Sequence, residues 1–413
     1  MNKKPDDVFI YPKTWINEDA MGFVATVEDW ARKEIISKRL EYQREYKRLF
    51  AEKRKKLLFD IGLDKIILPE KYGGFGWNTP GRAPDMFSVF LEIGKADATI
   101  GFMAAIKSAC LAIITMEPGM DESLLDELVP KYFSEEPKNV AVILPGPGIL
   151  NVETPLFMGR SIMASVKSTK ASNTVVGKDL RPTGGGADAD LFCVVCADKA
   201  KKSCIAFVPS DAKGLKKGKP IKETGLNACT NADVSFEEVK VPKPYLVKRD
   251  NAVQEIYAWL NLLFGGISLG AAINFYEILY DWADTRTIKG GGRLKENPLC
   301  ASVLADVAEE ISRARLLGLG LAHIMAQSGD RGGVGSPSVY TFAQMIGSSM
   351  QKGALAALNH GMELMGSAGY AKEWHVEKHW RDIKTIQAYL AGVGSDIPVK
   401  MDIARFFYDL KEV

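Results

Sequence analysis

The segment VQEIYAWLNLLFGGISLGAAINFYEILYDWADTR, residues 253–286, decides how the rest of the chain is interpreted. Its apolar residues recur with helical periodicity along the whole segment, which is the pattern of a long and largely buried helix. Two further long helical segments follow at 297–326 and 338–366, and a last helix is expected at 399–409. Long helices with apolar faces that follow one another in the chain predict an antiparallel bundle in the C-terminal part.

Short β-rich runs lie on the N-terminal side of this bundle, from about Asn139 onward. Turn residues separate the runs, among them the triple glycine at 184–186 and Pro242. Several short strands bounded by glycine and proline predict an antiparallel β-sandwich or barrel. The runs are VAVIL, SIMASV, NTVVG, DLFCVVCA, CIAFVP and DVSFEEVKVP.

The N-terminal third of the chain is helical again. A highly charged helical pattern runs from about Glu28 to Leu63, and further helical regions are expected at 83–115 and 121–133. The class is therefore α+β, with helices and strands segregated along the chain. We expect an N-terminal α-helical domain at 1–138, a middle β domain at 139–245 and a C-terminal helical-bundle domain at 246–413.

The overall charge of the chain is nearly balanced, with 53 basic and 51 acidic residues and a formal net charge of +2. This balance argues against nucleic-acid binding as the main function. The apolar stretch 99–115 is at the short limit for a membrane span and contains a lysine, so we expect a buried helix and no span. No secretory signal is visible and the six cysteines are scattered, so we expect a cytoplasmic protein.

Two short motifs have the spacing of reactive sites but lie in the wrong context. Gly266, Ser268 and Gly270 match a nucleophile elbow, which needs a strand before its serine and here lies within a helical segment. We expect these small residues to permit close helix packing instead. Cys193 and Cys196 lie in an apolar strand-like run without a second pair at zinc spacing, so we expect buried thiols and no metal.

Lys107 is the one charged residue in the apolar segment 99–115. A buried lysine is costly unless it is paired. Two interpretations stay open at this point. Either the ammonium reaches water or pairs with a structural carboxylate, or it faces a pocket and binds an anionic group of a substrate.

Five segments, taken in order, resemble the acyl-CoA dehydrogenase family. Each segment is modest alone, but five in the same order are specific and span nearly the whole chain. The resemblance implies an N-terminal helical domain, a middle β-sandwich or barrel and a C-terminal four-helix bundle. The segments are ILPEKYGGFGW (67–77), KADATIG (95–101), GLNACTNADVSFEEVKVP (225–242), ADTRTIKGG (283–291) and MGSAGYAKEWHVEKHWRDIKTIQAY (365–389).

The resemblance also implies an activity and its partners. Members of the family bind FAD between the β domain and the bundle, usually in a homotetramer built from dimers, so the resemblance implies a homo-oligomer, a dimer or tetramer. They transfer a hydride from Cβ of an acyl-CoA to flavin N5 while a glutamate removes the Cα proton, and an electron-transferring flavoprotein is the implied electron acceptor. A Cα–H is a poor acid until its enolate is stabilised and a base lies in reach.

The contacts to the flavin ring are partly kept. Thr183 corresponds to the family's threonine that contacts the ring, and Gly184 continues the same segment. The tryptophan of that segment is replaced by Arg181, and the threonine of the first β segment is replaced by Ile143.

The resemblance assigns a second group of residues to the rest of FAD. Arg286 matches the arginine that meets the pyrophosphate across a dimer, where a guanidinium suits phosphate. Gly366 and Gly369 match glycines of a turn where the backbone approaches the cofactor. Ser395 matches the threonine that follows the catalytic glutamate in the family.

The catalytic glutamate itself is missing from the three positions where the family carries it. Aligned forward from Tyr389 the position is Leu390, and aligned backward from 403–405 it is Val393. The alternative position on the first bundle helix is Leu260. None of the three residues is acidic.

Three interpretations follow from the missing base. Asp396, close in sequence, substitutes for it, although a turn or helix N-cap role is the alternative for that residue. Alternatively, the substrate forms its own carbanion by losing CO2, with Lys107 holding the carboxylate, in a non-redox decarboxylase or lyase. The third interpretation is a catalytically silent subunit of a hetero-oligomer. We expect an FAD-dependent acyl-CoA dehydrogenase-like oxidoreductase with a non-standard base, acting on a CoA thioester whose acyl group the sequence does not identify.

Overall fold

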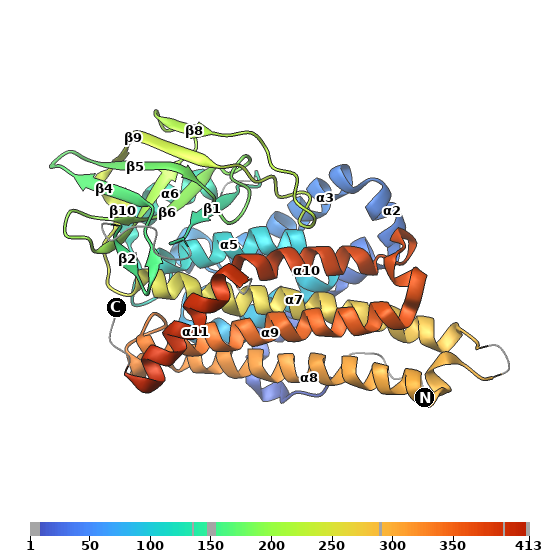
Figure 1. Ribbon diagram of the computed structural model, residues 1–413. Coiled ribbons are helices and arrows are strands. Elements are labelled where there is room, and N and C mark those ends of the chain that lie inside the picture. The colour runs from blue at the N-terminus through green and yellow to red at the C-terminus, as the bar shows by residue number, and fades with distance from the viewer. Residues whose placement is uncertain (1–8, 134–135, 147–153, 289–290, 391–392, 410–413) are drawn as a thin grey trace.

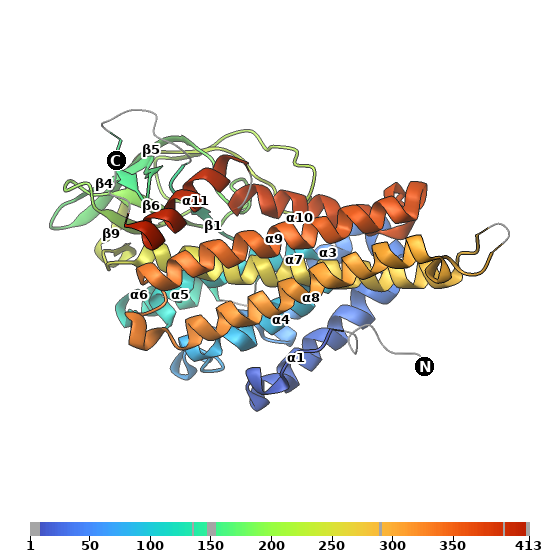
Figure 2. The same cartoon turned by 60° about the horizontal axis from the view of Figure 1, so that its bottom comes forward.

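The computed structural model describes residues 9–133, 136–146, 154–288, 291–390 and 393–409, and the side chains of Leu390 and of 393–395 are outside this description. Figure 1 shows a β-sheet at one end of the molecule, seated on a block of long, roughly parallel helices. Figure 2 shows α1 and α4 on the face of that block opposite the sheet. The order along the chain is helices, sheet and helices, as the sequence predicts.

The C-terminal bundle begins with α7 (Ala252–Thr285), which is buried along almost its whole length. It is followed by α8 (Pro298–Ala326) and α9 (Pro337–Met365), so the three long helices that the periodicity predicts are confirmed. Two shorter helices, α10 (Val376–Leu390) and α11 (Val393–Tyr408), complete the chain. The last helix begins earlier than expected, at Val393, and contains Pro398, a residue that usually lies at or before a helix start.

Glycines lie on both helices where α7 crosses α4 (Ala83–Ala96). A Cβ on Gly270 would overlap the backbone of Leu91, and one on Gly94 would overlap the backbone of Ile267. Ser268 is fully buried and donates a hydrogen bond of 2.8 Å to Gln351 of α9. The elbow-like motif is therefore a packing feature, as expected from its helical context.

The N-terminal helices form the second half of the helical block. The region expected as one helix at 83–115 is divided at Asp97, whose carboxylate caps α5 by accepting from Thr99 and Ile100. An aspartate in extended conformation with two backbone donors in reach starts a new helix. The elements are α1 (Glu18–Trp30), α2 (Arg39–Arg44), α3 (Tyr46–Lys55), α4, α5 (Ala98–Thr115) and α6 (Glu122–Tyr132).

The main sheet has the strand order β10-β7-β6-β4-β5-β9-β8, with β1 also paired to β6, and β2 and β3 form a separate two-stranded sheet. Most neighbouring strands are antiparallel, as expected, but β1 and β4 both pair with β6 in parallel, which the sequence did not predict. All seven residues of β6 are buried, as is typical of a strand covered on both faces. The strands are β1 (Val140–Ile143), β2 (Leu156–Phe157), β3 (Arg160–Ser161), β4 (Ala164–Ser168), β5 (Ser172–Leu180), β6 (Leu191–Ala197), β7 (Ser203–Pro209), β8 (Leu215–Lys217), β9 (Val234–Pro242) and β10 (Leu246–Val247).

Two described helices, α5 and α7, are long and apolar enough to cross a membrane by length and composition. Their most apolar windows are 94% and 100% buried inside the protein. Burial of this extent is what core helices of the block require, in line with the interpretation of 99–115 as a buried helix.

Candidate active site

A cavity of about 370 Å³ lies where the sheet meets the bundle. The ends of β1 and β5 form one wall, and α7, α9, α10 and α11 form the other. The residues that line it are Ile143, Leu144, Pro145, Gly146, Arg160, Met163, Asp179, Leu180, Arg181, Thr183, Tyr257, Gln344, Ala388, Tyr389, Pro398 and Val399.

Thr183 is fixed at this cavity by its backbone. Its N–H donates to Val142 at 2.8 Å and its carbonyl accepts from Val142 at 2.9 Å, which ties the end of β5 to β1. The hydroxyl has no hydrogen-bond partner among the described residues. Gly184, next in the chain, has a φ of +90°, and a Cβ there would overlap Ile106 of α5. The structure thus brings Thr183 to the cavity, whereas Gly184 is required by contact with α5.

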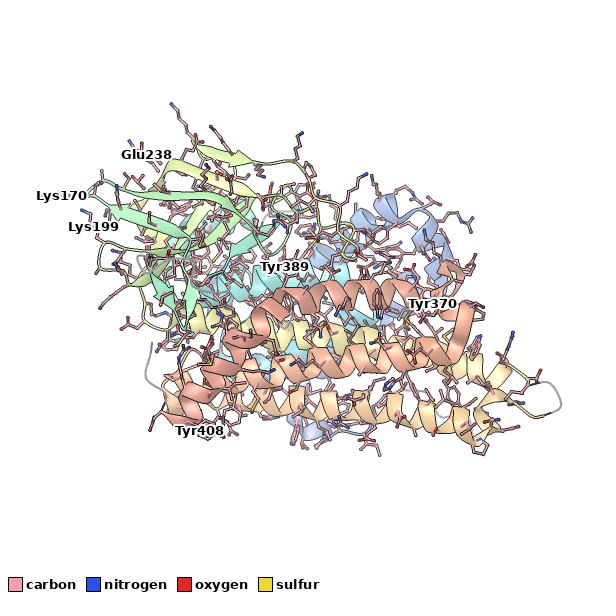
Figure 3. All side chains as sticks on the ribbon, in the orientation of Figure 1. Lys170, Lys199, Glu238, Tyr370, Tyr389 and Tyr408 are labelled. Atoms are coloured by element: carbon pink, nitrogen blue, oxygen red, sulfur yellow. The ribbon has the colours of Figure 1, made fainter. Side chains whose placement is uncertain are left out.

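Aromatic side chains close the side of the cavity nearest α5. Tyr389, labelled beneath the sheet in Figure 3, donates to Glu223 at 2.8 Å and accepts from Asn231 at 3.2 Å. Its ring lies 5.4 Å from that of Phe102, which stacks on Phe264 at 4.8 Å. These rings fill the contact between α5, α7 and α10 beside the cavity.

Arg160 introduces a buried positive charge into the lining, and sequence reasoning missed it. Its Nη1 donates to Asp402 at 2.6 Å, to Tyr340 at 3.2 Å and to the carbonyl of Met158 at 3.3 Å. Tyr340 in turn donates to the same oxygen of Asp402 at 2.7 Å. The pair joins β3 to α11 across 242 residues, so no local sequence pattern could reveal it.

Polar side chains of the bundle continue this network. Gln344 donates to the Tyr340 hydroxyl at 2.9 Å, and Asn261 of α7 donates to Gln344 at 3.1 Å. A second cavity of about 250 Å³ lies on the other side of Tyr340 and Asp402. The network therefore stands between two cavities. Arg160, Gln344 and Tyr257 line the larger one, and Tyr340 and Asp402 line the smaller.

Burial and neighbouring charges shift the pKa values of Arg160 and Tyr257 in opposite directions. Burial by itself lowers the pKa of Arg160, but Tyr257, Tyr340 and Asp402 raise it above its ordinary value, so the guanidinium is a fixed cation. Burial raises the pKa of Tyr257 to about 12 although Arg160 lies against its ring, so this phenol is neutral.

The wall of the cavity formed by helices carries no carboxylate among the described lining residues. The one acidic residue in that lining is Asp179, an exposed residue of the sheet that accepts from Ser235. Leu260, one of the three positions where the family carries its base, is fully buried in α7. The side chains of Leu390 and Val393, the other two positions, lie outside the described part.

Asp396 does not supply a free base. Its carboxylate binds Lys352 at 2.7 Å and Lys400 at 2.5 Å on the outside of the bundle, and it is not part of the described cavity lining. These two lysines hold its pKa below the ordinary value, which makes it a weaker base. The expectation that Asp396 faces the substrate is corrected accordingly. The residue lies in the first turn of α11, where a carboxylate interacts favourably with the helix dipole, and this position corresponds to the alternative role at a helix terminus.

Lys107 does not reach the cavity either. Its ammonium binds Asp64 at 2.6 Å and the carbonyl of Tyr132 at 2.7 Å, and it lies 4.5 Å from the ring centroid of Phe133. The expectation that it binds a substrate anion is therefore wrong, and the structural interpretation holds. It joins α5 to the segments around Asp64 and α6.

Arg286, Gly366 and Gly369 lie at the opposite end of the bundle from the cavity. Figure 3 shows Tyr370, which closes the turn Gly366–Tyr370, far from Tyr389, and Figure 1 shows α7 ending at the same distant end. Arg286 is exposed, and the contact given for its guanidinium among the described residues is with the ring of Trp282, 6.0 Å away. Within one chain these residues and Thr183 do not meet, and the side chain of Ser395 is outside the description.

Two family models match the chain. Residues 17–136 match acyl-CoA dehydrogenase, N-terminal domain, and residues 262–392 match acyl-CoA dehydrogenase, C-terminal domain. Among curated relatives, the mitochondrial short/branched chain specific acyl-CoA dehydrogenase of Bos taurus is 26% identical over 79% of this chain and 72% of its own length. Cyclohex-1-ene-1-carbonyl-CoA dehydrogenase of Syntrophus aciditrophicus is 24% identical over 91% of this chain and 87% of its own length.

Solved structures agree in fold. Glutaryl-CoA dehydrogenase from Mycobacterium smegmatis superposes with a TM-score of 0.79 at 16% identity, covering 100% of both chains. Butyryl-CoA dehydrogenase from Megasphaera elsdenii superposes with a TM-score of 0.74 at 19% identity, covering 95% of this chain and 98% of its own.

Proposed function

Because the chain belongs to the acyl-CoA dehydrogenase family, we propose that it binds FAD in the cavity between sheet and bundle and acts there on a CoA thioester. Matches to the family's N- and C-terminal models together span more than half of the chain and support this proposal. A structural neighbour with a TM-score of 0.76 is a glutaryl-CoA dehydrogenase from Mycobacterium smegmatis in complex with FADH2.

The residues at the cavity fit a flavin. Apolar side chains such as Ile143, Leu180 and Val399 offer a surface for a flat ring, while the Thr183 hydroxyl is a hydrogen-bonding group without a protein partner among the described residues. Arg181 lies at the rim and is held by Asp233. The unpartnered hydroxyl beside the apolar side chains of Ile143 and Leu180 is the observation that carries the proposal.

FAD would supply a hydride acceptor to this cavity. The chain's own residues would enclose the reacting carbons: Tyr389 and Phe102 keep water out from the α5 side, and Gln344 presents an amide from the bundle. Asp396 is held by two lysines outside the described lining, and the helices contribute no carboxylate to that lining to take the Cα proton. We therefore propose that a dehydrogenase of this kind uses a non-standard base.

Arg286, Gly366 and Gly369 enter the proposal through a second copy of the chain, whereas Ser395 keeps the FAD contact that the resemblance implies for it. An exposed arginine at the far end of the bundle can reach FAD only in a neighbouring subunit, and a guanidinium fork suits its pyrophosphate. We therefore propose a homo-oligomer, a dimer or tetramer, in which each FAD contacts two chains. Six free cysteines fit a reduced cytoplasm, and an electron-transferring flavoprotein is the proposed electron acceptor.

A second candidate function is non-redox decarboxylation of an acyl-CoA that carries a carboxylate on Cα. One observation favours it: Arg160 of β3 brings a buried cation to the cavity, and the helices contribute no carboxylate to its described lining. In this reaction the bond from Cα to the carboxylate breaks, CO2 leaves and the electron pair stays in the thioester enolate. A proton from water then completes the product, so neither a base nor an oxidant is consumed.

The test begins with the purified chain and its flavin absorbance. We expect the wild-type protein to retain added FAD and Thr183→Val to retain it more weakly, because the variant removes only the free hydroxyl. Anaerobic mixing with acyl-CoAs then separates the candidates, since bleaching indicates dehydrogenation and CO2 release without bleaching indicates decarboxylation. A colourless protein that neither retains FAD nor binds a CoA thioester would leave the silent-subunit alternative.

A further inference from the structure

Two guanidinium groups share one buried carboxylate beside the larger cavity. Asp402 is 1% exposed, binds Arg160 at 2.6 Å through one oxygen and binds Arg405 at 3.2 Å through the other. It is the one carboxylate within 4 Å of either guanidinium in the part of the chain that the structure describes. This Arg160–Asp402–Arg405 cluster therefore carries two positive charges and one negative charge. Arg160 is 6% exposed and Arg405 is 17% exposed, and an excess charge that is mostly shielded from water is costly unless a partner compensates it.

Both arginines have donors that the protein does not use. All three hydrogen bonds of Arg160 come from Nη1, and none among the described residues uses its Nε or Nη2. Nε of Arg405 is buried and has no partner among the described residues. Arg160 lines the cavity of about 370 Å³ and Arg405 lines that of about 250 Å³. The unused donors thus belong to residues on both cavities.

The other arginine at the larger cavity, Arg181, has its guanidinium donors occupied by the protein. Arg181 places both Nε and Nη2 on the two oxygens of Asp233, so its fork is occupied by the protein. It is also half-exposed, with a side-chain exposure of 55%, whereas that of Arg160 is 6%. Arg160 is therefore the guanidinium of this lining that has free donors in a largely desolvated position.

We infer that the Arg160–Asp402–Arg405 cluster is an anion-recognition subsite, at which Arg160 binds an oxyanion group of the CoA thioester. A guanidinium fork binds carboxylate and phosphate equally well in geometry, so the group is a carboxylate on the acyl part or a phosphate of CoA. The inference rests on the proposed function, because it specifies the ligand of that same cavity. A substrate of this kind supplies the negative charge that the cluster lacks.

The experiment compares four ligands on the FAD-loaded protein by isothermal titration calorimetry. Glutaryl-CoA and pentanoyl-CoA differ in the carboxylate, and the corresponding pantetheine thioesters lack the phosphates. In Arg160→Met we expect roughly a tenfold or greater loss of affinity, since a charge-assisted hydrogen bond is removed. The loss is confined to the two glutaryl ligands if the group is the carboxylate, and to the two CoA ligands if it is phosphate.

Asp402→Asn should change the ligand affinity in the opposite direction. The amide keeps the shape and can still accept from Tyr340, while the cluster gains one net positive charge, so we expect severalfold tighter binding of the same ligands. A merely structural link between β3 and α11 predicts instead that both variants weaken all four ligands alike. Arg313→Met removes an exposed arginine paired with Glu309 and Glu310 and serves as the matched control, with no change expected.

Several results overturn the inference. An equal change for all four ligands in Arg160→Met, no change in either variant, or weaker binding in Asp402→Asn would each do so. If Arg160→Met does not fold, Arg160→Lys keeps the charge, removes the fork and should show the same selectivity with a smaller loss. Failure of all four ligands to bind the wild-type protein is a separate result, which contradicts the proposed function itself.

Discussion

The molecule contains two buried clusters of charged side chains that differ in how fully their groups are paired. In the first, Lys378 binds Asp97 at 3.0 Å and Asp382 at 2.5 Å. Asp97 also accepts from the α5 backbone and from Tyr42, and Asp382 accepts from the backbone of Leu226 at 2.7 Å. In the second, the Arg160–Asp402–Arg405 cluster, guanidinium donors remain unused next to two cavities.

The difference separates a structural role from a binding role. The Lys378 cluster joins α2, α5, α10 and the segment before β9, and its partners come from the protein, so it holds the fold together. The Arg160 cluster joins β3, α9 and α11 but leaves guanidinium donors without a protein partner among the described residues, next to cavities. Buried charges are retained by a fold when they are paired, so an incompletely paired group at a cavity indicates a ligand.

The largest expected effect is on stability in Lys378→Met. The variant leaves two buried carboxylates without their cation, and we expect the free energy of unfolding to fall by about 3–5 kcal/mol. Urea denaturation followed by circular dichroism measures it. Lys33→Met, which breaks the exposed pair of Lys33 with Asp29, is the control and should cost at most about 1 kcal/mol. Equal losses in the two variants would remove the distinction between the clusters.

Asp402→Asn should destabilise less, by about 1–3 kcal/mol, because the freed guanidinium donors lie at cavities that water and ligands can enter. Thermal unfolding with and without glutaryl-CoA measures both parts of this prediction. The ligand should restore a larger share of the melting temperature in the variant than in the wild-type protein. If the stability fell as much as in Lys378→Met, and glutaryl-CoA did not raise the melting temperature of the variant, the cluster would not have donors open to water and ligands.

Lowering the pH should destabilise the protein through His379, which lies beside the Lys378 cluster. Burial, together with the charges of Lys378 and Arg39, lowers the pKa of His379 to about 3, from an unfolded value near 6.5. Below about pH 6.5 the unfolded chain binds a proton there that the native protein does not, so stability falls by about 1.4 kcal/mol per pH unit down to about pH 3.

Urea titrations between pH 7 and pH 4 test this slope. His379→Gln keeps a polar partner for Asn274, which lies 3.0 Å from the imidazole Nε2, and should remove about that much of the slope. His360→Gln replaces an exposed histidine of α9 and is the matched control. A slope that is the same in wild type and His379→Gln would show that other groups cause the acid sensitivity.

The smallest expected effect is that of Asp396→Asn. Its two lysine contacts are at the surface of the bundle, so the stability change should stay within about 1 kcal/mol. Turnover with acyl-CoA should equal that of the wild-type protein, because the residue does not lie in the described lining. Loss of turnover with unchanged stability would return Asp396 to the role of base.

The helices were predictable from the sequence because their signal is local. Residues 253–286 carry the periodicity of α7 in one continuous segment, and α7 begins and ends within one residue of that range. The parallel pairing of β4 with β6 was not predictable. β5 follows β4 in the chain and pairs with it in antiparallel orientation, whereas β6 comes later in the chain and pairs with the other edge of β4, which no local pattern indicates. Resemblance to the family found Thr183, whose position at the cavity no composition or spacing would reveal.

The charged residues show the same limit more sharply. Lys107 stood out as a lone charge in an apolar helix, but its partner Asp64 is 43 residues away and belongs to a different element. Arg160 gave no signal at all, because its partner Asp402 is 242 residues distant in the chain. Periodicity identifies which positions are buried, whereas the pairing of buried charges depends on tertiary contacts that the sequence does not display.

The glycine contacts between α4 and α7 bear on how the chain is made. Leu91 and Gly94 lie against Gly270 and Ile267, yet about 150 residues separate the end of α5 from the middle of α7. At roughly 5–20 residues per second, the ribosome exposes the apolar pair α4–α5 for on the order of ten seconds or longer before its partner emerges. During synthesis, therefore, the sheet can form before the helices that will support it are complete, and the newborn N-terminal part needs protection from aggregation until α7 arrives.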